Sequence, residues 1–501
     1  MHRRAIVAVF GLLAACGGRQ SPEGSDPDAP PESFVYTVAV APNLEELDIT
    51  VCFEGAAPEA LFAGQRAAAS ACHTVEDRTP GRPPRRLERQ GNRIPLDAIP
   101  TGGCVGYMID LESAISSNFL AGLAMGRTIV ANASIWLWRP AGLGDRSGEV
   151  RFELASGLDV AVPWAREGQG YRLDARTFGF LSHVVFGEFE RVPVQTPGDE
   201  QIEVILVPGS TVLGPDGLRR WIENASAQVT HLTGRFPADG AMVVVVPIDR
   251  GDDPVAFGNV GRGGGASVML LANKDATYDE LIAHWVPVHE FSHLAMPYVQ
   301  REDAWLSEGI ATYYQEILRA RAGVISPLDA WRNIDRGFAS GRRAGTGRSL
   351  REESRAVYQT FAFRRVYWGG TAIALLADIE LRRGDYQARS LDDLVAAIGD
   401  CCNETTRPWP ADRVLGHFAE TAGAPVVSEV AEPLLASSEF PDVDAALGYL
   451  GLVRGESGRL EFDDTAPGAE LRQAITAPHP ALADAPSLAE VDETGQREAS
   501  P

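Results

Sequence analysis

Two histidines four residues apart are the most informative feature of the sequence. His289 and His293 occur in the stretch VHEFSHLAM, with Glu290 directly after the first of them. Residues four apart on an α-helix are offset by only about 40° around its axis, so both imidazoles can bind one metal ion. Glu290 projects where it can reach a water molecule on that ion, and it is poorly placed to be a third ligand. This spacing is typical of the helix of a zinc peptidase.

The residues around the motif predict that it is helical. Pro287 would kink this helix and Pro297 marks its expected end. The alternative is that the two histidines are hydrogen-bonded core residues, but histidine is scarce, with nine in 501 residues, so a chance motif is rare. Apolar side chains recur at intervals of three and four, as on a packed helix: Tyr278, Leu281, Ile282, Trp285, Val288, Phe291 and Leu294.

A third ligand is expected downstream, in DAWLSEGIATYYQEIL (303–318). Ser307 is expected to cap a helix that begins near Glu308. Glu308 lies 15 residues after His293, which is enough for a turn and an antiparallel helix that returns the carboxylate to the metal. Two histidines, one glutamate and an open position for water form a catalytic zinc site, so we expect one Zn²⁺ per chain. The apolar face of the second helix would consist of Ile310, Tyr313, Tyr314 and Ile317.

The pattern of strands and helices predicts an α+β chain with two domains. Residues 34–198 contain short runs rich in branched and aromatic residues, separated by Gly, Pro and Asp, which favour a β-sandwich or a similar pair of sheets. Residues 199–454 combine strands such as AMVVVVPI with the helices of the metal motif, as in a mixed catalytic domain. Residues 455–501 are rich in Pro, Ala and acidic residues and are expected to be largely disordered.

The first residues predict export. Residues 1–16, MHRRAIVAVFGLLAAC, have a positive start and an apolar run that is too short to span a membrane, as in a signal peptide. LLAAC resembles a bacterial lipobox, which implies cleavage before Cys16 and lipid attachment to it. Residues 17–33 would then be a flexible linker, and the protein would be anchored to a membrane of the bacterial cell envelope, facing the periplasm or the exterior. An ordinary signal peptide with an incidental cysteine is the alternative.

Charge and cysteine content limit the partners. A net charge of −23 makes the chain a poor nucleic-acid binder, so no nucleic-acid partner is expected. Disulfides are plausible in an exported protein, and five cysteines beyond Cys16 leave at least one without an internal partner. These five are Cys52, Cys72, Cys104, Cys401 and Cys402. Any two of the first three could form a disulfide, and the adjacent Cys401 and Cys402 could bridge each other, though with strain.

The zinc motifs resemble a known family, the glycyl aminopeptidase-like zinc metallopeptidases, which are relatives of aminopeptidase N and thermolysin. The resemblance rests on HEFSH followed by AWLSEGIATYYQEILRARAG, and on VYWGGTAIALLADIELR, which is similar to the later helix that begins at an active-site tyrosine. It extends over about residues 34–454 and implies that residues 199–454 have a thermolysin-like fold that hydrolyses peptide bonds. The PDZ domain that often follows in this family is not expected, because only about 47 residues remain.

The resemblance also implies roles for single residues. Glu290 would act as general base toward a zinc-activated water, and Tyr367 would stabilise the oxyanion with its phenol. Aminopeptidases of the family hold the substrate's free amine with a glutamate on a Gly-rich edge strand. The matching residues here are Gly264, Gly265, Ala266 and Ser267, with Ala266 in place of that glutamate.

The missing glutamate predicts the direction of cleavage. A buried ammonium group requires a carboxylate partner, and Ala266 supplies none. We therefore expect an endopeptidase that acts on extracytoplasmic peptides or proteins. The alternatives are an aminopeptidase of the same family, a zinc hydrolase of other substrates, and a non-catalytic binding lipoprotein on the cell surface.

Overall fold

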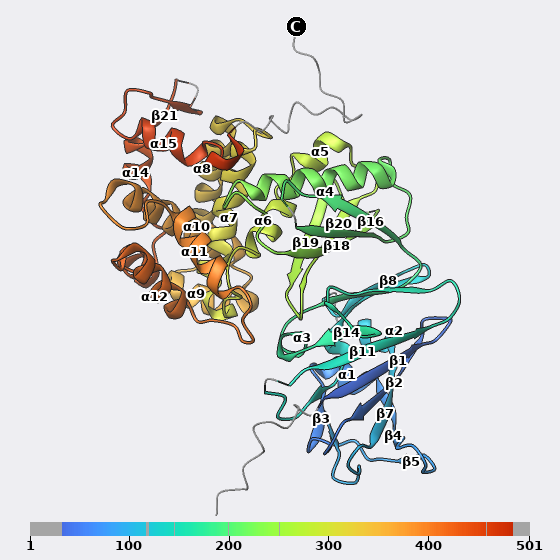
Figure 1. Cartoon of the computed structure of the whole chain (residues 1–501). Helices are drawn as coiled ribbons and strands as arrows, with labels where there is room; N and C mark the ends of the chain where they lie inside the picture. The colour runs from blue at the N-terminus through green and yellow to red at the C-terminus, as the bar shows by residue number, and fades with distance from the viewer. Residues whose placement is uncertain are drawn as a thin grey trace, which may run out of the picture.

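The computed structural model describes residues 33–116, 120–144, 146–198, 200–249, 251–456 and 458–483. In Figure 1 a β-rich amino-terminal domain, blue to teal, lies below a larger domain whose sheet is green and whose helices run from green to red. The predicted signal peptide, the lipidation site at Cys16 and nearly all of the linker lie outside the described residues.

The amino-terminal domain is built from three sheets. A three-stranded sheet has the order β10 (Arg139–Pro140), β3 (Ala60–Phe62), β6 (Arg93–Pro95). A four-stranded sheet has the order β12 (Asp159–Ala161), β15 (His183–Gly187), β9 (Thr128–Asn132), β8 (Gly122–Met125). The largest, with eight strands, has the order β13 (Arg166–Glu167), β14 (Gly170–Leu173), β11 (Gly148–Leu154), β1 (Phe34–Val40), β2 (Glu46–Phe53), β7 (Cys104–Asp110), β4 (Cys72–Asp77), β5 (Arg85–Arg86). Short helices connect them: α1 (Arg66–Ala71), α2 (Leu111–Ile115), η1 (Ala133–Ile135) and α3 (Ala175–Gly179).

These sheets enclose one core, in the manner of the predicted sandwich. Side chains alternate between buried and partly exposed along β1 and β2, which is the two-residue period of a sheet with one covered face. Buried Tyr36 of the large sheet and Phe186 of the four-stranded sheet belong to the same hydrophobic cluster. A disulfide joins Cys52 to Cys104 across β2 and β7, and Cys72 is a buried free thiol.

The second domain begins earlier than predicted. β16 (Glu190–Gln195) was expected to close the first domain, but it pairs antiparallel with β17 (Gln201–Leu206) of the second. The sheet continues with β18 (Gly240–Ile248) and β20 (Ala266–Asn273), both parallel to β17, and ends at β19 (Val255–Gly261), which is antiparallel to β20. The predicted boundary at residue 199 is therefore about ten residues too late. The sequence of a strand does not show which other strand it pairs with, and so it does not show which sheet the strand joins.

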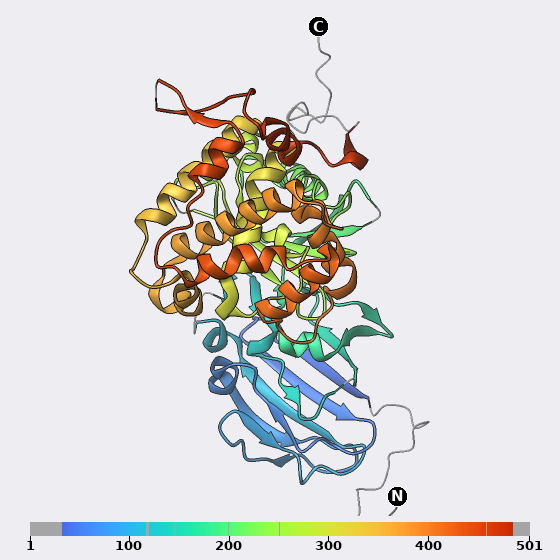
Figure 2. The same ribbon diagram turned by 90° about the vertical axis from the view of Figure 1, so that its left-hand side faces the viewer.

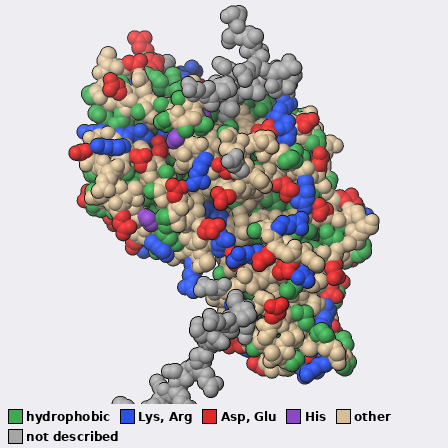
Figure 3. Space-filling model, viewed as in Figure 1, with side chains coloured by type: hydrophobic (Ala, Val, Ile, Leu, Met, Phe, Trp, Pro, Cys, Tyr) green, Lys and Arg blue, Asp and Glu red, His purple; other side chains and the backbone are tan. Residues whose placement is uncertain are grey.

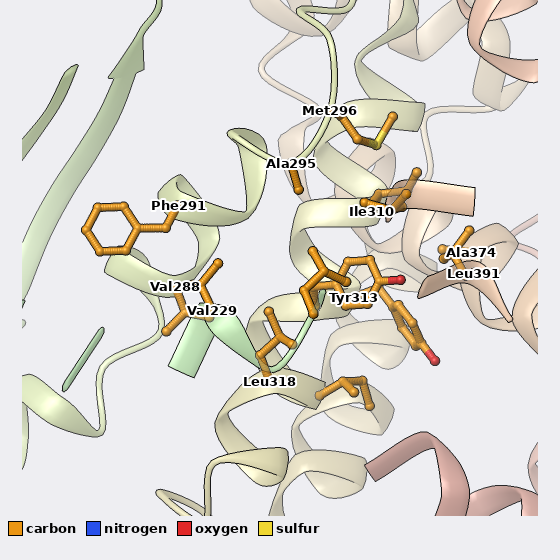
Figure 4. Close-up of a cluster of buried hydrophobic side chains, with 14 of the residues drawn as sticks. Val229, Val288, Phe291, Ala295, Met296, Ile310, Tyr313, Leu318, Ala374 and Leu391 are labelled. Atoms are coloured by element: carbon orange, nitrogen blue, oxygen red, sulfur yellow. The ribbon is translucent and has the colours of Figure 1, made fainter. Parts of the chain in front are cut away.

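Helices form the rest of this domain, and Figure 2 shows them gathered above the β-rich domain. Close packing joins α7 to α10: a Cβ atom on Gly309 would lie 2.5 Å from the backbone of Gly370, so only glycine fits there. Figure 4 shows the apolar side chains that join α6, α7 and α10, including Phe291, Ile310 and Ala374. The helices are α4 (Gly214–Thr230), α5 (Tyr278–Ile282), α6 (Val286–His293), η2 (Arg301–Asp303), α7 (Ala304–Arg321), α8 (Pro327–Arg343), α9 (Leu350–Thr360), α10 (Phe363–Arg383), α11 (Leu391–Cys402), α12 (Ala411–Ala422), α13 (Val426–Ala436) and α14 (Asp444–Tyr449).

Part of the segment that was predicted to be disordered is folded. After β21 (Leu452–Arg454) the chain forms β22 (Leu460–Phe462), α15 (Ala469–Thr476) and η3 (Pro480–Leu482). Buried Arg472 donates to the carbonyl oxygen of Leu450, and Arg321 of α7 donates to that of Ile475. These hydrogen bonds tie the segment to the helical domain. Residues 484–501 lie outside the described residues, so disorder there remains an expectation.

Charge is spread rather than concentrated on the surface seen in Figure 3, where acidic and basic side chains alternate. Within the described residues, no helix has both the length and the apolar character that a membrane-spanning segment requires.

Candidate active site

The metal motif lies on a shorter helix than predicted. The chain forms α5, breaks at residues 283–285, and resumes as α6, with Pro287 in the first turn. Proline is tolerated there because the first amides of a helix have no acceptor within it. The helix ends at His293, four residues before Pro297. The motif itself lies entirely within α6, so His289 and His293 project from one face.

Glu308 lies in the second turn of α7, and not at the start of a helix. α7 begins at Ala304, so Ser307 is an interior residue and the predicted cap is wrong. The Asp303 carboxylate, at the residue before the helix, accepts a hydrogen bond from the backbone of Ala411. The α6–α7 pair still returns Glu308 to the histidines, as the spacing predicted.

The three predicted ligands converge. Oε2 of Glu308 lies 3.3 Å from Nε2 of His289 and 3.5 Å from Nε2 of His293. One ligand atom from each residue falls within 4.8 Å of the other two. Two imidazole nitrogens and one carboxylate oxygen form the donor set that zinc prefers in catalytic sites. The residues therefore fit a zinc ion.

The electrostatics of the cluster favour ionised glutamate beside the histidines. Burial alone would raise the pKa of Glu308, but the charge of His293 and hydrogen bonds from both histidines hold it well below its usual range. Burial would lower the pKa of His289, yet the hydrogen bond to Glu308 and the nearby carboxylates raise it. Both shifts arise from the attraction between the Glu308 carboxylate and the imidazoles.

Gln315 fixes the orientation of His289, and sequence reasoning missed it. Its Oε1 lies 2.9 Å from Nδ1 of His289, which leaves Nε2 directed at Glu308. Nε2 of Gln315 in turn donates to Glu316, whose carboxylate pairs with Arg319 at 2.9 Å. The signal was available, because Gln315 lies seven residues after Glu308 on the same helix, two turns away.

Glu290 points toward the edge strand of the sheet. A Cβ atom on Gly258 of β19 would lie 2.6 Å from Cγ and 2.9 Å from Oε1 of Glu290, so the absence of a side chain at Gly258 makes room for this carboxylate. Burial raises the pKa of Glu290, while the charges of His289 and His293 oppose that shift. A carboxylate of raised pKa beside a metal cluster suits proton transfer near neutral pH.

Tyr367 lies one turn into α10, and its ring stacks on His289 with centroids 6.2 Å apart and planes at 12°. Burial and the negative charge of Glu308 raise the pKa of its phenol, so the hydroxyl stays protonated as a donor. Tyr358 of α9 also lies near the cluster, and burial together with Glu308 raises its pKa to about 12. Sequence reasoning did not identify Tyr358, which no motif marks.

The predicted substrate strand is not at the edge of the sheet. β20, which begins at Ala266, is paired with β18 on one side and β19 on the other, so it has no free edge for a peptide. Ser267 is buried, and its hydroxyl accepts a hydrogen bond from the backbone of His183. Gly264 and Gly265 pack on the amino-terminal domain, where Cβ atoms would collide with Trp164 and Pro163. The expectation that a peptide pairs with this strand is therefore wrong. Gly264, Gly265 and Ala266 line the cavity between the two domains, and a role for them in binding substrate stays a prediction.

A large cavity lies beside the zinc cluster rather than at it. It has a volume of about 1570 Å³ and lies between the two domains. Leu294 and Ala295, directly after the second histidine, line it, but none of the zinc ligands does. The chemistry of the convergent donors, and not cavity size, therefore identifies the site.

Comparison with known proteins shows the fold. No protein-family model matches the sequence, and no curated protein is similar to it. An aminopeptidase N family protein from Idiomarina loihiensis superimposes with a TM-score of 0.65 at 14% identity, over 84% of this chain and 78% of that one. An M1 zinc metallopeptidase from Deinococcus radiodurans gives 0.51 at 15% identity, over 82% and 95%. A mutant of the latter, bound to a Tyr-Ser-Ala substrate, gives 0.52 at 17% identity and the same coverage. The chain thus has the two-domain fold of these metallopeptidases.

Proposed function

We propose that this chain is a zinc-dependent peptidase. The observation that carries the proposal is the convergence of His289, His293 and Glu308, from two helices, with Glu290 directly beside them. A non-catalytic binding protein has no use for a general base at such a cluster. The shared fold supports the proposal, because the structures that superimpose on this chain are described as zinc metallopeptidases.

Each side chain of the site has a definable task. A zinc ion held by the three ligands would supply Lewis-acid activation of water and of the scissile carbonyl. Glu290 takes the proton from the attacking water and later delivers it to the leaving amine. Tyr367 donates a hydrogen bond to the carbonyl oxygen as negative charge develops on it. Gln315 keeps His289 in the orientation that directs Nε2 at the ligand cluster.

The edge strand β19 is the surface on which an extended peptide would bind. It is the terminal strand of the sheet, and it packs against α6 beside Glu290. A free edge can pair with a substrate through main-chain hydrogen bonds. This proposal replaces the one based on residues 264–267.

The composition of β19 favours cleavage within a peptide. Its sequence, VAFGNVG, contains no acidic residue, and Gly258 lies against Glu290. A substrate ammonium buried at this strand would have no carboxylate from β19 as partner, and an isolated buried cation is costly. We therefore infer an endopeptidase, or an enzyme indifferent to the substrate's amino terminus. Aminopeptidase activity is the second candidate, since one of the superimposed structures is an aminopeptidase N family protein.

Two otherwise identical peptides, one with a free amino terminus and one acetylated, distinguish these activities. We expect the kcat/KM values for the two to agree within about threefold, because no charged contact to the amine is lost on acetylation; a lost charged hydrogen bond would cost about 1.5–3 kcal/mol. Mass spectrometry of the products gives the cleavage position in the same assay. Removal of single residues from the free peptide, with none from the acetylated one, would establish the aminopeptidase instead.

We also propose that the protein is exported and anchored by lipid at Cys16, in the bacterial cell envelope. The basic start, the short apolar run and LLAAC support this. We expect Cys16→Ser to lose the lipid and to move the protein from the membrane fraction to the soluble fraction, or to leave its leader uncleaved. Intact-mass analysis of both forms, each purified from fractionated cells, is the measurement. A Cys16→Ser protein with unchanged processing and membrane attachment would refute the anchor.

A further inference from the structure

Cys401, Cys402 and His417 form a second cluster of metal-ligating side chains, separate from the zinc ligands. The two cysteines are the last residues of α11 and are joined in a disulfide. His417 comes from the middle of α12, which packs against α11. Its Nε2 lies 3.2 Å from Sγ of Cys401 and 3.3 Å from Sγ of Cys402. One imidazole nitrogen thus faces both sulfur atoms.

The surroundings hold the imidazole in this orientation. The ring of His417 stacks on Trp409 with centroids 6.1 Å apart and planes at 14°. The guanidinium of Arg413 covers the Trp409 ring at 3.7 Å from its centroid. Nδ1 of His417 is buried and has no hydrogen-bond partner among the described residues, so Nε2 is the nitrogen offered to a ligand. Cys401 is exposed, which gives solutes access to the sulfurs.

We propose that reduction of this disulfide creates a binding site for a soft monovalent cation, Cu(I). The ligands would be the two thiolates and Nε2 of His417, whose donor atoms already lie within 4.8 Å of one another. Thiolate sulfur selects soft ions such as Cu(I), and imidazole is compatible with them. In the disulfide form the sulfurs are bonded to each other and are poor ligands.

The number and kind of ligands favour Cu(I) over other ions. Calcium and magnesium require oxygen ligands, and the carboxylates next to the cluster are engaged elsewhere. Asp400 pairs with Arg235, and Glu404 pairs with Arg176 at 2.9 Å. Structural zinc sites almost always have four protein ligands, and here the described residues provide three. A three-coordinate soft cation matches that set.

The chemistry balances with a dithiol as reductant. Two electrons and two protons pass from the dithiol to the protein, so the Cys401–Cys402 bond breaks and the reductant becomes a disulfide. Binding of Cu(I) then releases the two thiol protons, because thiolates are the ligands. No change in oxidation state occurs at that step.

The cluster is adjacent to the zinc helix without being part of its site. The side-chain amide of Asn403, the residue after the disulfide, donates to the carbonyl oxygen of Leu294 at 2.7 Å. The backbone of Trp409 pairs with the segment at Val299. These bonds join the end of α11 and the segment before α12 to the connection between α6 and α7.

Anaerobic titration with Cu(I) tests the proposal. The zinc-loaded protein is reduced with a phosphine, freed of reductant, and titrated with Cu(I) against a chromogenic Cu(I) chelator. We expect one tightly held Cu(I) per reduced chain, with near-ultraviolet absorption from thiolate-to-copper charge transfer, and none in unreduced protein. Zinc content, measured in parallel, should not change.

Variants assign the bound ion to the cluster. Cys401→Ser/Cys402→Ser should abolish Cu(I) uptake, and His417→Gln should weaken it at least about tenfold, the lower limit for loss of an outer-shell partner. Cys72→Ser is the matched control, because it removes the buried free thiol in the other domain, and it should bind Cu(I) like the unmodified chain. Cys52 and Cys104 are present in every variant, so any Cu(I) that they take up after reduction is a common background and cannot account for a difference between variants. The proposal would be overturned if the double variant took up as much Cu(I) as the unmodified chain, or if the reduced unmodified chain took up none. If the double variant does not fold, His417→Gln tests the proposal independently.

Discussion

Glu290→Gln is expected to retain one zinc ion per chain and to lower kcat for peptide hydrolysis by about 10⁴-fold, the upper end of what general acid–base catalysis contributes. Glutamine has nearly the shape of glutamate, so it fits the space beside Gly258. Its amide cannot accept a proton from water. Because Glu290 is outside the ligand set, the cluster of His289, His293 and Glu308 stays intact. Zinc analysis and single-turnover kinetics on the same sample measure both quantities.

Tyr367→Phe provides a graded comparison within the same experiment. Losing one donor to the developing oxyanion should cost on the order of 10²–10³ in kcat, with little change in zinc content, since the phenol is not a ligand. The stacked ring remains in phenylalanine, so the packing on His289 is retained. Near-normal turnover by Glu290→Gln would show that another group is the general base.

The zinc cluster could be predicted from sequence because its geometry is local. A four-residue spacing fixes the relation of His289 to His293 once the segment is helical, and apolar periodicity indicates the helix. The prediction of Glu308 as the third ligand required only that a second helix run back alongside the first. The structure brings all three together. Helix ends were less predictable. α6 is shorter than its apolar pattern, and α7 begins at Ala304, before Ser307, without a side-chain cap.

The order of strands in the sheet could not be predicted from the sequence. The strand that was expected to lie at the edge of the sheet and pair with substrate therefore proved to be an interior strand. β19 precedes β20 in the sequence, yet β20 lies between β18 and β19. The Gly-rich stretch at 263–265 resembles an edge-strand motif, but its glycines are needed for close contact with Pro163 and Trp164 of the other domain. Such contacts between distant segments leave no periodic signal in the chain.

Composition was likewise a poor guide to the carboxyl-terminal segment. Residues 455–483 are polar and proline-containing, which predicts disorder, but a few side chains anchor them. Ile475 is fully buried, and Arg472 is buried with its guanidinium bonded to backbone oxygens. One or two such side chains hardly change the composition of a segment. They are nevertheless enough to hold it in place when the domain already provides backbone oxygens that accept their hydrogen bonds.

Removal of zinc should have an effect at least as large as that of Glu290→Gln. Without the metal, water keeps a pKa near 15.7, and Glu290 has no activated nucleophile from which to take a proton. The three ligands would remain close, held by the hydrogen bond that His289 donates to Gln315 and by helix packing. The fold should therefore survive chelation, and zinc should restore activity. Circular dichroism of the metal-free protein checks that the fold is retained.

The most direct test of the central claim is a zinc titration of the metal-free protein, with cleavage of a diverse peptide mixture mapped by mass spectrometry. The account predicts no cleavage without zinc, then new internal termini that increase in proportion to added zinc and level off at one ion per chain. Glu308→Ala should stay inactive over the same range, whereas Glu420→Ala, an exposed carboxylate on α12, should behave like the unmodified chain. Cleavage that persists in the metal-free protein, or that fails to appear at stoichiometric zinc, would contradict the assignment of this chain as a zinc peptidase.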